Sequence, residues 1–376
     1  MKCDSESPQG TRQKNDNTYT KKMGSEEKAI VRSKECYLSA FASDGIPTSD
    51  HLRFRTVDLP VSVTSIPDGH IAVEILSISV DPYLRTRMLG REDGLYFSQF
   101  KLDEVVLSCG VGKVIASKDD RYATGDITMS LVFPVAEYAV VPSELIMRKI
   151  DPASGIPLQE YVSSIGVPGF AAWVVVELLG LDLKQGSNVF ISAAAGGVGM
   201  YAGQLFKLKG CRVIGSTGSD EKVKLVKDEF GYDDAFNYKV ETDLDAALSR
   251  YFPDGIDFYL DNVGGKTLEA VLNHVNTRAH IVLCGMVSQY NQVWTERDGV
   301  RNLLNMVGKE VKMEGFMMGT YFDRFEDFVK DMEHYLREGK IKSKHRINQG
   351  IEAFVDSLGS IFSSSNIGKL IIQVNP

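Results

Sequence analysis

The sequence has few of the residues that would mark a metal site or a disulfide framework. Its 6 histidines are widely spaced, and its 5 cysteines contain no C-x-x-C pair. Zinc is held in proteins by closely grouped cysteine and histidine ligands, so we expect no metal site. Because the cysteines are scattered and odd in number, they favour free thiols in the cytoplasm over disulfides. They are Cys3, Cys36, Cys109, Cys211 and Cys284.

Basic charge and long apolar runs are also scarce. The formal net charge is −8 at pH 7, so no surplus of Lys and Arg exists to neutralise nucleic-acid phosphates or an anionic membrane. The longest apolar stretch, residues 167–179, is too short to span a bilayer and contains Glu177. The N-terminus lacks the apolar core of a secretory signal. We therefore expect a cytoplasmic protein without a nucleic-acid or membrane partner.

The chain is long enough for two domains, and its predicted secondary structure changes along its length. Residues 1–27 are polar and mixed in charge, which predicts a disordered tail. Residues 28–154 contain strand-like runs broken by turns. Residues 155–339 alternate strands with helices, which predicts a doubly wound parallel sheet. Residues 340–376 return to short strands, and the last of them is expected to pair back into the β-rich domain.

Within 155–339 the apolar runs predict specific elements. The predicted strands are 189–192, 212–216, 235–238, 258–262, 280–285 and 312–316, and the predicted helices include 200–209, 222–230, 244–251 and 268–275. Residues 159–180 are also predicted to be helical, with an interruption at Gly166, Pro168 and Gly169.

A glycine-rich turn between a predicted strand and a predicted helix is the strongest chemical signal. Ala193, Gly196 and Gly199 form an A-x-x-G-x-x-G pattern directly after the apolar run at 189–191. Small residues let the backbone approach a pyrophosphate, and free N–H groups at a helix N-terminus attract its charge. Because the flanking strand and helix are both present, we predict a dinucleotide site. Its residues are Ala193, Gly196, Gly197, Val198 and Gly199.

The second predicted strand of this unit lacks the acid that an NAD site usually places at its end. Residues 213–218 read Val-Ile-Gly-Ser-Thr-Gly, and Lys222 follows. An open pocket beside a cation suits a ribose 2′-phosphate, so these residues favour NADPH. Asp220 and Glu221 count against this interpretation, since either carboxylate could turn into the pocket.

Several segments together resemble the medium-chain dehydrogenase/reductase superfamily. They are SVDPYLRTRM at 79–88, GSDEKV at 218–223, FGYDDAFNYK at 230–239, DNVGG at 261–265, CGMVSQYN at 284–291 and NIGK at 366–369. The resemblance is to the prostaglandin reductase and leukotriene B4 dehydrogenase-like branch, and within it to plant NADP-dependent 2-alkenal (double-bond) reductases. It implies a Rossmann NADP-binding domain at 155–339. It also implies a GroES-like β-rich catalytic domain formed by 28–154 and 340–376, so the expected fold class is α/β.

The resemblance also implies cofactor contacts. Lys222 and Tyr238 match residues at the adenosine-phosphate end of NADPH. Taken without the resemblance, Lys222 would be a solvated lysine at a helix start, and Tyr238 a packing tyrosine. The residues matched to the nicotinamide half are Asn262, Cys284, Gly285, Ser288, Tyr290, Phe316, Met317, Met318 and Asn366.

The activity that the resemblance implies is NADPH-dependent reduction of the carbon–carbon double bond of an α,β-unsaturated aldehyde or ketone, without zinc. Hydride addition to the β-carbon leaves negative charge on the carbonyl oxygen, and a hydroxyl donor stabilises this enolate. The resemblance makes Tyr290 the candidate donor, because Tyr290 matches the family tyrosine beside the nicotinamide. A tyrosine with a pKa of about 10 is protonated at neutral pH and can donate. The proton for the α-carbon comes from Tyr290 or from water.

Two further tyrosines are candidate substrate residues. Tyr83 is either a second catalytic residue or part of the pocket wall, and Tyr96 is a third pocket residue. Arg85 and Arg87 are expected to be structural or interfacial.

Two alternatives remain open at this point. The chain could be an NADPH quinone oxidoreductase, or a member of the superfamily that binds NADPH without turnover. The Tyr290 segment argues against the quinone oxidoreductase, and the intact tyrosines and glycine turn argue against the non-catalytic member. The resemblance suggests a homodimer, with the apolar run 281–287 at an edge of the sheet.

Overall fold

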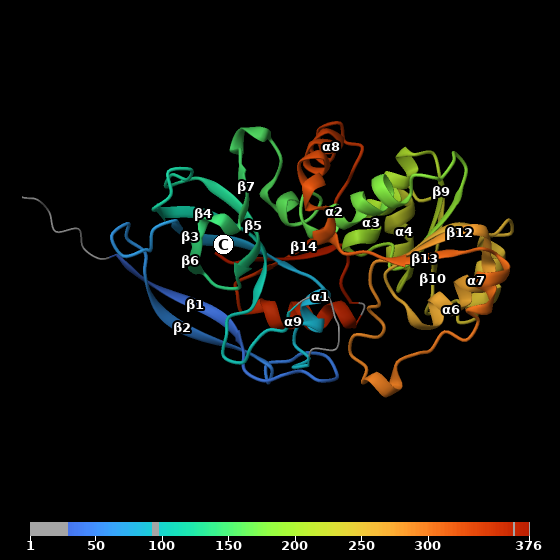
Figure 1. Ribbon diagram of the computed structural model, residues 1–376, viewed down its shortest axis with the longest axis horizontal. Coiled ribbons are helices and arrows are strands. Elements are labelled where there is room, and N and C mark those ends of the chain that lie inside the picture. Colours follow the sequence, from blue (N-terminus) through green and yellow to red (C-terminus); the bar gives the residue numbers. More distant parts are fainter. Residues whose placement is uncertain (1–28, 92–97, 364, 376) are drawn as a thin grey trace, which may run out of the picture.

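The computed structural model describes residues 29–91, 98–363 and 365–375. A β-rich domain and a Rossmann domain lie side by side, and the C-terminal segment returns to the β-rich domain (Figure 1). In these described ranges no helix has the length and apolar character needed to cross a membrane. The predicted tail 1–27 and the candidate Tyr96 lie outside the described residues.

The Rossmann domain is built on a parallel sheet. In the described chain its strand order is β10-β9-β8-β11-β12-β13. The order reverses between β8 and β11, and ligands of open α/β sheets bind at this switch point. The predicted Rossmann sheet is therefore confirmed. Its strands are β8 (Asn188–Ile191), β9 (Arg212–Thr217), β10 (Asp234–Asn237), β11 (Ile256–Asp261), β12 (Val275–Leu283) and β13 (Lys312–Gly315).

Helices cover both faces of this sheet because its strands are apolar on both sides. Val189 and Ile191 belong to one core cluster, whereas Phe190 between them belongs to another. The first cluster contains residues of α3 (Gly197–Leu208), α4 (Asp220–Asp228) and α8 (Phe325–Arg337), and the second contains residues of α5 (Leu244–Tyr251) and α6 (Gly265–His274).

The β-rich domain contains the larger sheet, with order β14-β15-β3-β4-β5-β7 and with β6 paired to β3. Leu370 in β15 lies opposite Val80 in β3, so the predicted return of the C-terminal strand is confirmed. The division of the chain at 154/155 and 339/340 remains a proposal, supported by this membership of the two sheets. The elements are β1 (Ile30–Leu38), β2 (Leu52–Pro60), β3 (His70–Val80), α1 (Tyr83–Thr86), β4 (Leu107–Ser117), β5 (Ile127–Pro134), β6 (Tyr138–Pro142), β7 (Ile146–Ile150), β14 (His345–Gln349), α9 (Ala353–Phe362) and β15 (Lys369–Gln373).

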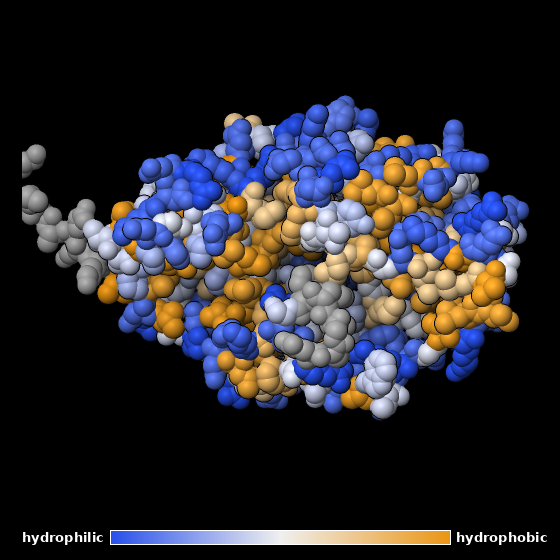
Figure 2. Space-filling model, in the orientation of Figure 1, coloured by the Kyte–Doolittle hydropathy of each residue, from blue (hydrophilic) through white to orange (hydrophobic). Residues whose placement is uncertain are grey.

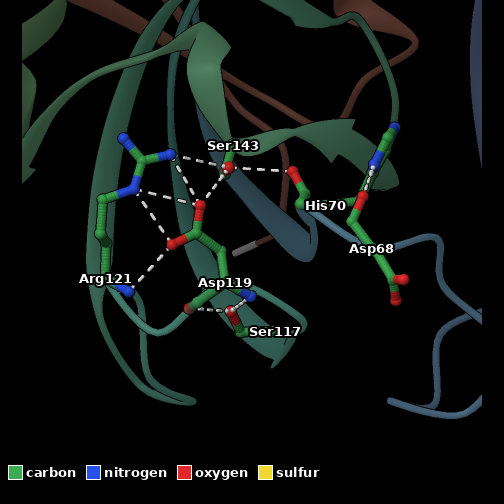
Figure 3. A network of polar contacts seen from close by, with 7 residues as sticks. Asp68, His70, Ser117, Asp119, Arg121 and Ser143 are labelled. Carbon is green, nitrogen blue, oxygen red and sulfur yellow. Dashed lines mark hydrogen bonds and ion pairs between the residues drawn. The ribbon is translucent and has the colours of Figure 1, made fainter.

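A polar network holds the turns at the start of β3 (Figure 3). Arg121 donates from Nη2 to the Asp119 carboxylate over 2.7 Å, and Ser143 Oγ lies 2.5 Å from the same carboxylate. These hydrogen bonds lower the pKa of Asp119 below its ordinary value. The Ser143 hydroxyl also lies 2.9 Å from Gly69 O. The network is at the start of β3, whereas the candidate residue Tyr83 follows the end of β3. We therefore interpret the network as structural.

The segment expected to be an interrupted helix over 159–180 is divided into η3 (Leu158–Val162), α2 (Val167–Val174) and the π-helical η4 (Val175–Leu179). The interruption lies at Gly166, the N-cap of α2, whereas Pro168 and Gly169 lie within α2. The chain folds tightly here, since a Cβ on Gly169 would lie 1.8 Å from Ser164 O. The run 281–287 does not begin at a sheet edge, because β12 lies between β11 and β13. The edge strand on this side of the described sheet is β13.

Candidate active site

The glycine turn lies where β8 ends and α3 begins. Gly196 is the N-cap of α3, so the first amide N–H groups of the helix have no acceptor within it. A Cβ on Gly199 would lie 2.5 Å from Ala193 O, so only glycine allows this close approach. Ala193 has a left-handed φ of 51°, which curves the backbone around the turn. These features fit the pyrophosphate of a dinucleotide.

Tyr232 supports this turn from behind, and the sequence analysis missed it. Its hydroxyl donates to Gly199 O over 2.7 Å. Its ring fills the space that side chains on Gly203 and Gly215 would occupy, since a Cβ on Gly203 would lie 2.1 Å from the ring. The two glycines were the available signal, because glycine in α3 and in β9 indicates close approach of another group.

Two lysines stand beyond the carboxyl ends of β9 and β10. Lys222 is 8% exposed in the first turn of α4, and burial together with Lys239 lowers its pKa. Lys239 was not predicted. Asp220, which could have turned into the pocket, instead accepts a hydrogen bond from Asn237 Nδ2 over 2.8 Å. Tyr238 lies beside these groups, its amide donating to Thr217 O over 3.0 Å.

The loop after β11 is fixed by a buried carboxylate. Asp261 Oδ1 accepts from the Tyr259 hydroxyl over 2.7 Å and from the Gly264 amide over 2.8 Å. Burial raises the pKa of Asp261. The Asn262 side chain donates from Nδ2 to Ser192 O over 2.8 Å. This bond ties the predicted cofactor contact Asn262 to the residue that precedes the glycine turn.

The loop after β12 is held against the loop after β11. The amides of Cys284 and Gly285 donate to Asp261 O over 2.8 and 3.0 Å. Ser288 Oγ donates to Val263 O over 2.6 Å. The predicted residues Asn262, Cys284, Gly285 and Ser288 therefore lie on two loops joined by backbone hydrogen bonds.

Tyr290 belongs to the same loop and folds back over its beginning. The Met286 amide donates to the Tyr290 hydroxyl oxygen over 3.2 Å. A Cβ on Gly285 would lie 3.1 Å from that oxygen. A hydrogen bond received by a hydroxyl oxygen polarises its O–H group and strengthens it as a donor. The structure thus places the Tyr290 hydroxyl at the carboxyl end of β12, near the switch point.

Tyr83 is contributed by the β-rich domain, in the short helix α1 directly after β3. Burial raises its pKa, and the neighbouring Asp81 carboxylate raises it further. Asp81 itself accepts a hydrogen bond from Lys369 Nζ over 2.7 Å. Tyr83 is therefore a protonated hydroxyl at neutral pH, suited to donate a hydrogen bond.

The remaining predicted residues frame this site. Phe316 and Met318 are partly buried against the same core cluster as Cys284. Met317 is the N-cap of η6 (Met318–Arg324). Asn366 is half-buried, and the Gly368 amide that follows it donates to Ala195 O over 3.2 Å. The C-terminal return therefore reaches the glycine turn. Lys222 and Tyr238 stand at a different part of the sheet edge, beyond β9 and β10.

The described residues offer no donor set for zinc. Throughout residues 29–91, 98–363 and 365–375, no three His, Cys, Asp or Glu side chains are placed to share a metal ion. Burial raises the pKa of the Cys109 and Cys284 thiols to about 12, whereas zinc binds thiolates.

The molecular surface is hollowed between the two domains, and apolar residues border the hollow on the side of the β-rich domain (Figure 2). An apolar wall with a few hydroxyl and amide groups is typical of a small-molecule site.

Comparison with known proteins agrees with this geometry. Residues 197–334 match the family described as "Zinc-binding dehydrogenase", and residues 35–148 match "N-terminal domain of oxidoreductase". The chain is 37% identical to (+)-pulegone reductase of Mentha piperita, over 92% of this chain and 99% of that protein. It is also 37% identical to the NADP(+)-dependent 2-alkenal reductase of Nicotiana tabacum, over 92% of this chain and 98% of that protein.

A solved structure has the same architecture. The chain superimposes on CurA from Vibrio vulnificus in complex with NADPH, with a TM-score of 0.82 and 31% sequence identity. The match covers 91% of this chain and 99% of that chain.

Proposed function

This chain belongs to the medium-chain dehydrogenase/reductase family and is an NADPH-dependent oxidoreductase, and we propose that it reduces the carbon–carbon double bond of α,β-unsaturated aldehydes and ketones. Relatives named for 2-alkenal and pulegone reduction, each 37% identical over 92% of the chain, support this substrate class. The observation that carries the proposal is the Tyr290 hydroxyl, which the Met286 amide polarises at the carboxyl end of β12.

The binding of NADPH is divided among the loops at the sheet edge. The α3 N-terminus, with Gly196 and Gly199, would hold the pyrophosphate. Lys222 and Lys239 would hold the 2′-phosphate by charge. Asn262 and the loop that contains Cys284 would line the nicotinamide half. The remaining proposed cofactor contacts are Ala193, Gly197, Val198, Tyr238, Gly285, Ser288, Tyr290, Phe316, Met317, Met318 and Asn366.

NADPH supplies the hydride that adds to the β-carbon of the substrate. Tyr290 donates a hydrogen bond to the carbonyl oxygen, where negative charge accumulates as the hydride arrives. A donor fixed in place before the reaction stabilises that charge without reorganising, which is the main contribution that a protein makes here. The proton that completes the reduction at the α-carbon is delivered by Tyr290 or by water.

Tyr83 is the second proposed substrate residue. Burial and the Asp81 carboxylate raise its pKa, so Tyr83 remains protonated and acts as a donor and as part of the pocket wall. Tyr83 and Tyr290 come from different domains, so a substrate between them contacts both domains.

We also propose a cytoplasmic homodimer. The four cysteines of the described chain are free, which agrees with a reducing compartment. Strand β13 is an open edge of the sheet, and in α7 (Leu304–Gly308) nearby Leu304 and Val307 are 79% and 77% exposed. Antiparallel pairing of two β13 strands about Met313 would place Lys312 opposite Glu314 of the partner subunit, which gives a self-complementary contact.

The test is NADPH consumption with a panel of 2-alkenals, enones and quinones, followed by identification of the products. The proposal predicts turnover of alkenals or enones to products saturated at the carbon–carbon bond. Turnover of quinones alone would instead favour the quinone oxidoreductase. NADPH binding without turnover of any acceptor would favour the non-catalytic alternative.

A further inference from the structure

A buried arginine connects the β-rich domain to the loop that carries Tyr290. Arg85 lies in α1 and its side chain is fully buried. Its Nε donates to Asn291 Oδ1 over 2.9 Å and to Gly45 O over 3.1 Å, and its Nη1 donates to Ala42 O over 2.8 Å. The guanidinium thus joins three segments that are distant in the sequence.

The connection is reinforced by the backbone. The Gly45 amide donates to Asn291 O over 2.9 Å, so Asn291 is held through both its side chain and its carbonyl. Burial lowers the pKa of Arg85 to about 10, which leaves the guanidinium protonated at neutral pH. The connection therefore persists under the conditions in which a reductase works.

The positions of these residues in the sequence give the connection its meaning. Arg85 follows Tyr83 by two residues in α1, and Asn291 directly follows Tyr290. Tyr83 and Tyr290 are proposed to face the substrate from opposite domains. The hydrogen bond between Arg85 and Asn291 therefore connects the two backbones within two residues of these tyrosines. Asn291 and Arg85 are 206 positions apart in the chain.

The loop of Tyr290 has a second anchor in its own domain. Val287 donates from its amide to Asn262 O over 3.1 Å, and Ser288 Oγ donates to Val263 O. Tyr290 thus lies between an anchor on the Rossmann sheet and an anchor on Arg85. The first sets its position relative to the cofactor site, and the second its position relative to the substrate wall.

We propose that Arg85 is a positioning residue for the reductase reaction, acting through Asn291 to hold the Tyr290 hydroxyl in register with Tyr83. This inference rests on the proposed function of the site. Arginine suits the task because the donors of its planar guanidinium have fixed directions, whereas the ammonium of lysine is a point charge on a flexible stem. A donor displaced by about 1 Å loses about 10²-fold in rate, although NADPH remains bound.

The test measures kcat with an enone, the NADPH dissociation constant and the melting temperature for Arg85→Met, Asn291→Leu and the double variant. We expect kcat to fall about 10²-fold in each single variant, with the NADPH dissociation constant unchanged. Because the residues act as a pair, the double variant should be no slower than either single variant. Asn291→Asp keeps the acceptor and should keep most of the wild-type kcat, whereas Arg85→Lys should not.

The chain supplies a matched control. Arg212 donates from Nη1 to Asn188 Oδ1 over 3.1 Å, at the amino ends of β8 and β9 and therefore at the opposite edge of the sheet. Arg212→Met breaks an Arg–Asn bond of the same kind and should leave kcat unchanged. If Arg85→Met fails to fold, Asn291→Leu carries the test.

The outcomes separate this inference from the proposed function. Wild-type kcat in Arg85→Met or Asn291→Leu would overturn the inference alone. So would additive losses in the double variant, or a loss of activity explained by weaker NADPH binding. If the wild-type protein reduces no enone, the proposed function is overturned, and this inference is overturned with it.

Discussion

The Lys369 ammonium lies 2.7 Å from the Asp81 carboxylate, and the two side chains are only 2% and 8% exposed. Lys369 also donates to Val80 O over 2.7 Å. The pair joins β15 to the end of β3, two residues before Tyr83, and so fastens the C-terminal return to the proposed substrate wall. Removing one member of such a pair leaves an uncompensated buried charge.

Lys369→Met should therefore destabilise the protein strongly. We expect the free energy of unfolding, measured in urea, to fall by about 3–5 kcal/mol. Adding Asp81→Asn to this variant should recover part of the loss, because the stranded charge is removed. Lys149→Met, which removes the exposed lysine of a surface pair with the half-buried Asp126, should cost less than about 1 kcal/mol. Equal stability of Lys369→Met and the wild type would contradict a supporting role for the pair.

Lys222→Ala should weaken NADPH binding and leave NADH binding nearly unchanged. Loss of a charge-assisted contact to the 2′-phosphate should cost about 1.5–3 kcal/mol, or roughly tenfold to 10²-fold in the dissociation constant. Fluorescence titration with both cofactors measures this. Lys224→Ala, on the exposed side of the same helix and paired with Asp228, is the control. Equal weakening of both cofactors would show that Lys222 does not recognise the phosphate.

The preference for NADPH over NADH should also weaken as the pH becomes alkaline. Burial and Lys239 lower the pKa of Lys222 below the ordinary lysine value of 10.5. The ammonium is present below this lowered pKa and is lost as the pH rises through it. The ratio of NADPH affinity to NADH affinity should therefore fall as the pH rises through the lowered pKa of Lys222. This fall should occur at a lower pH than it would if an exposed lysine bound the phosphate.

Tyr290→Phe should separate binding from turnover. The variant keeps the ring but loses the donor to the developing enolate, so kcat with an enone should fall about 10²–10³-fold. NADPH should still bind tightly, because the aromatic ring that is proposed to contact the cofactor is kept. Tyr122→Phe, in the turn beside the Asp119 network, is a control that should leave kcat intact. Unchanged turnover by Tyr290→Phe would remove Tyr290 from the donor role.

Leu304→Lys combined with Val307→Lys should dissociate the proposed homodimer. Both side chains are exposed in α7 beside the open edge of β13, and two lysines there would repel their copies in a partner. Sedimentation velocity should show a dimer for the wild type and a monomer for the variant. Leu181→Lys, at a site that is 69% exposed on another part of the chain, should remain dimeric. A monomeric wild type would contradict the assembly.

The Rossmann half of the fold was predictable from local sequence. Its strands are short apolar runs buried on both faces, and the helix predicted at 244–251 coincides with α5 (Leu244–Tyr251). The interruption of the helical segment 159–180 was predicted from Gly166, Pro168 and Gly169, whereas its π-helical end, η4, was not. Strand patterns also do not state which strand is outermost, so the edge position of β13 needed the structure.

The candidate residues that the sequence does propose lie in short contiguous segments, with the glycine turn in one and Tyr290 in another. The structure connects these two segments through Ser192, Asp261 and Asn262. Lys239 was missed because its role depends on its distance from Lys222, and not on a motif of its own. The contact between Arg85 and Asn291 was unpredictable for the same reason, since it joins two domains.

The most direct test of the central claim uses NADPH deuterated at C4 of the nicotinamide and an α,β-unsaturated ketone. The account predicts a saturated ketone that carries deuterium at its β-carbon. Deuterium at the carbonyl carbon of an allylic alcohol, or consumption of NADPH with quinones alone, would contradict it.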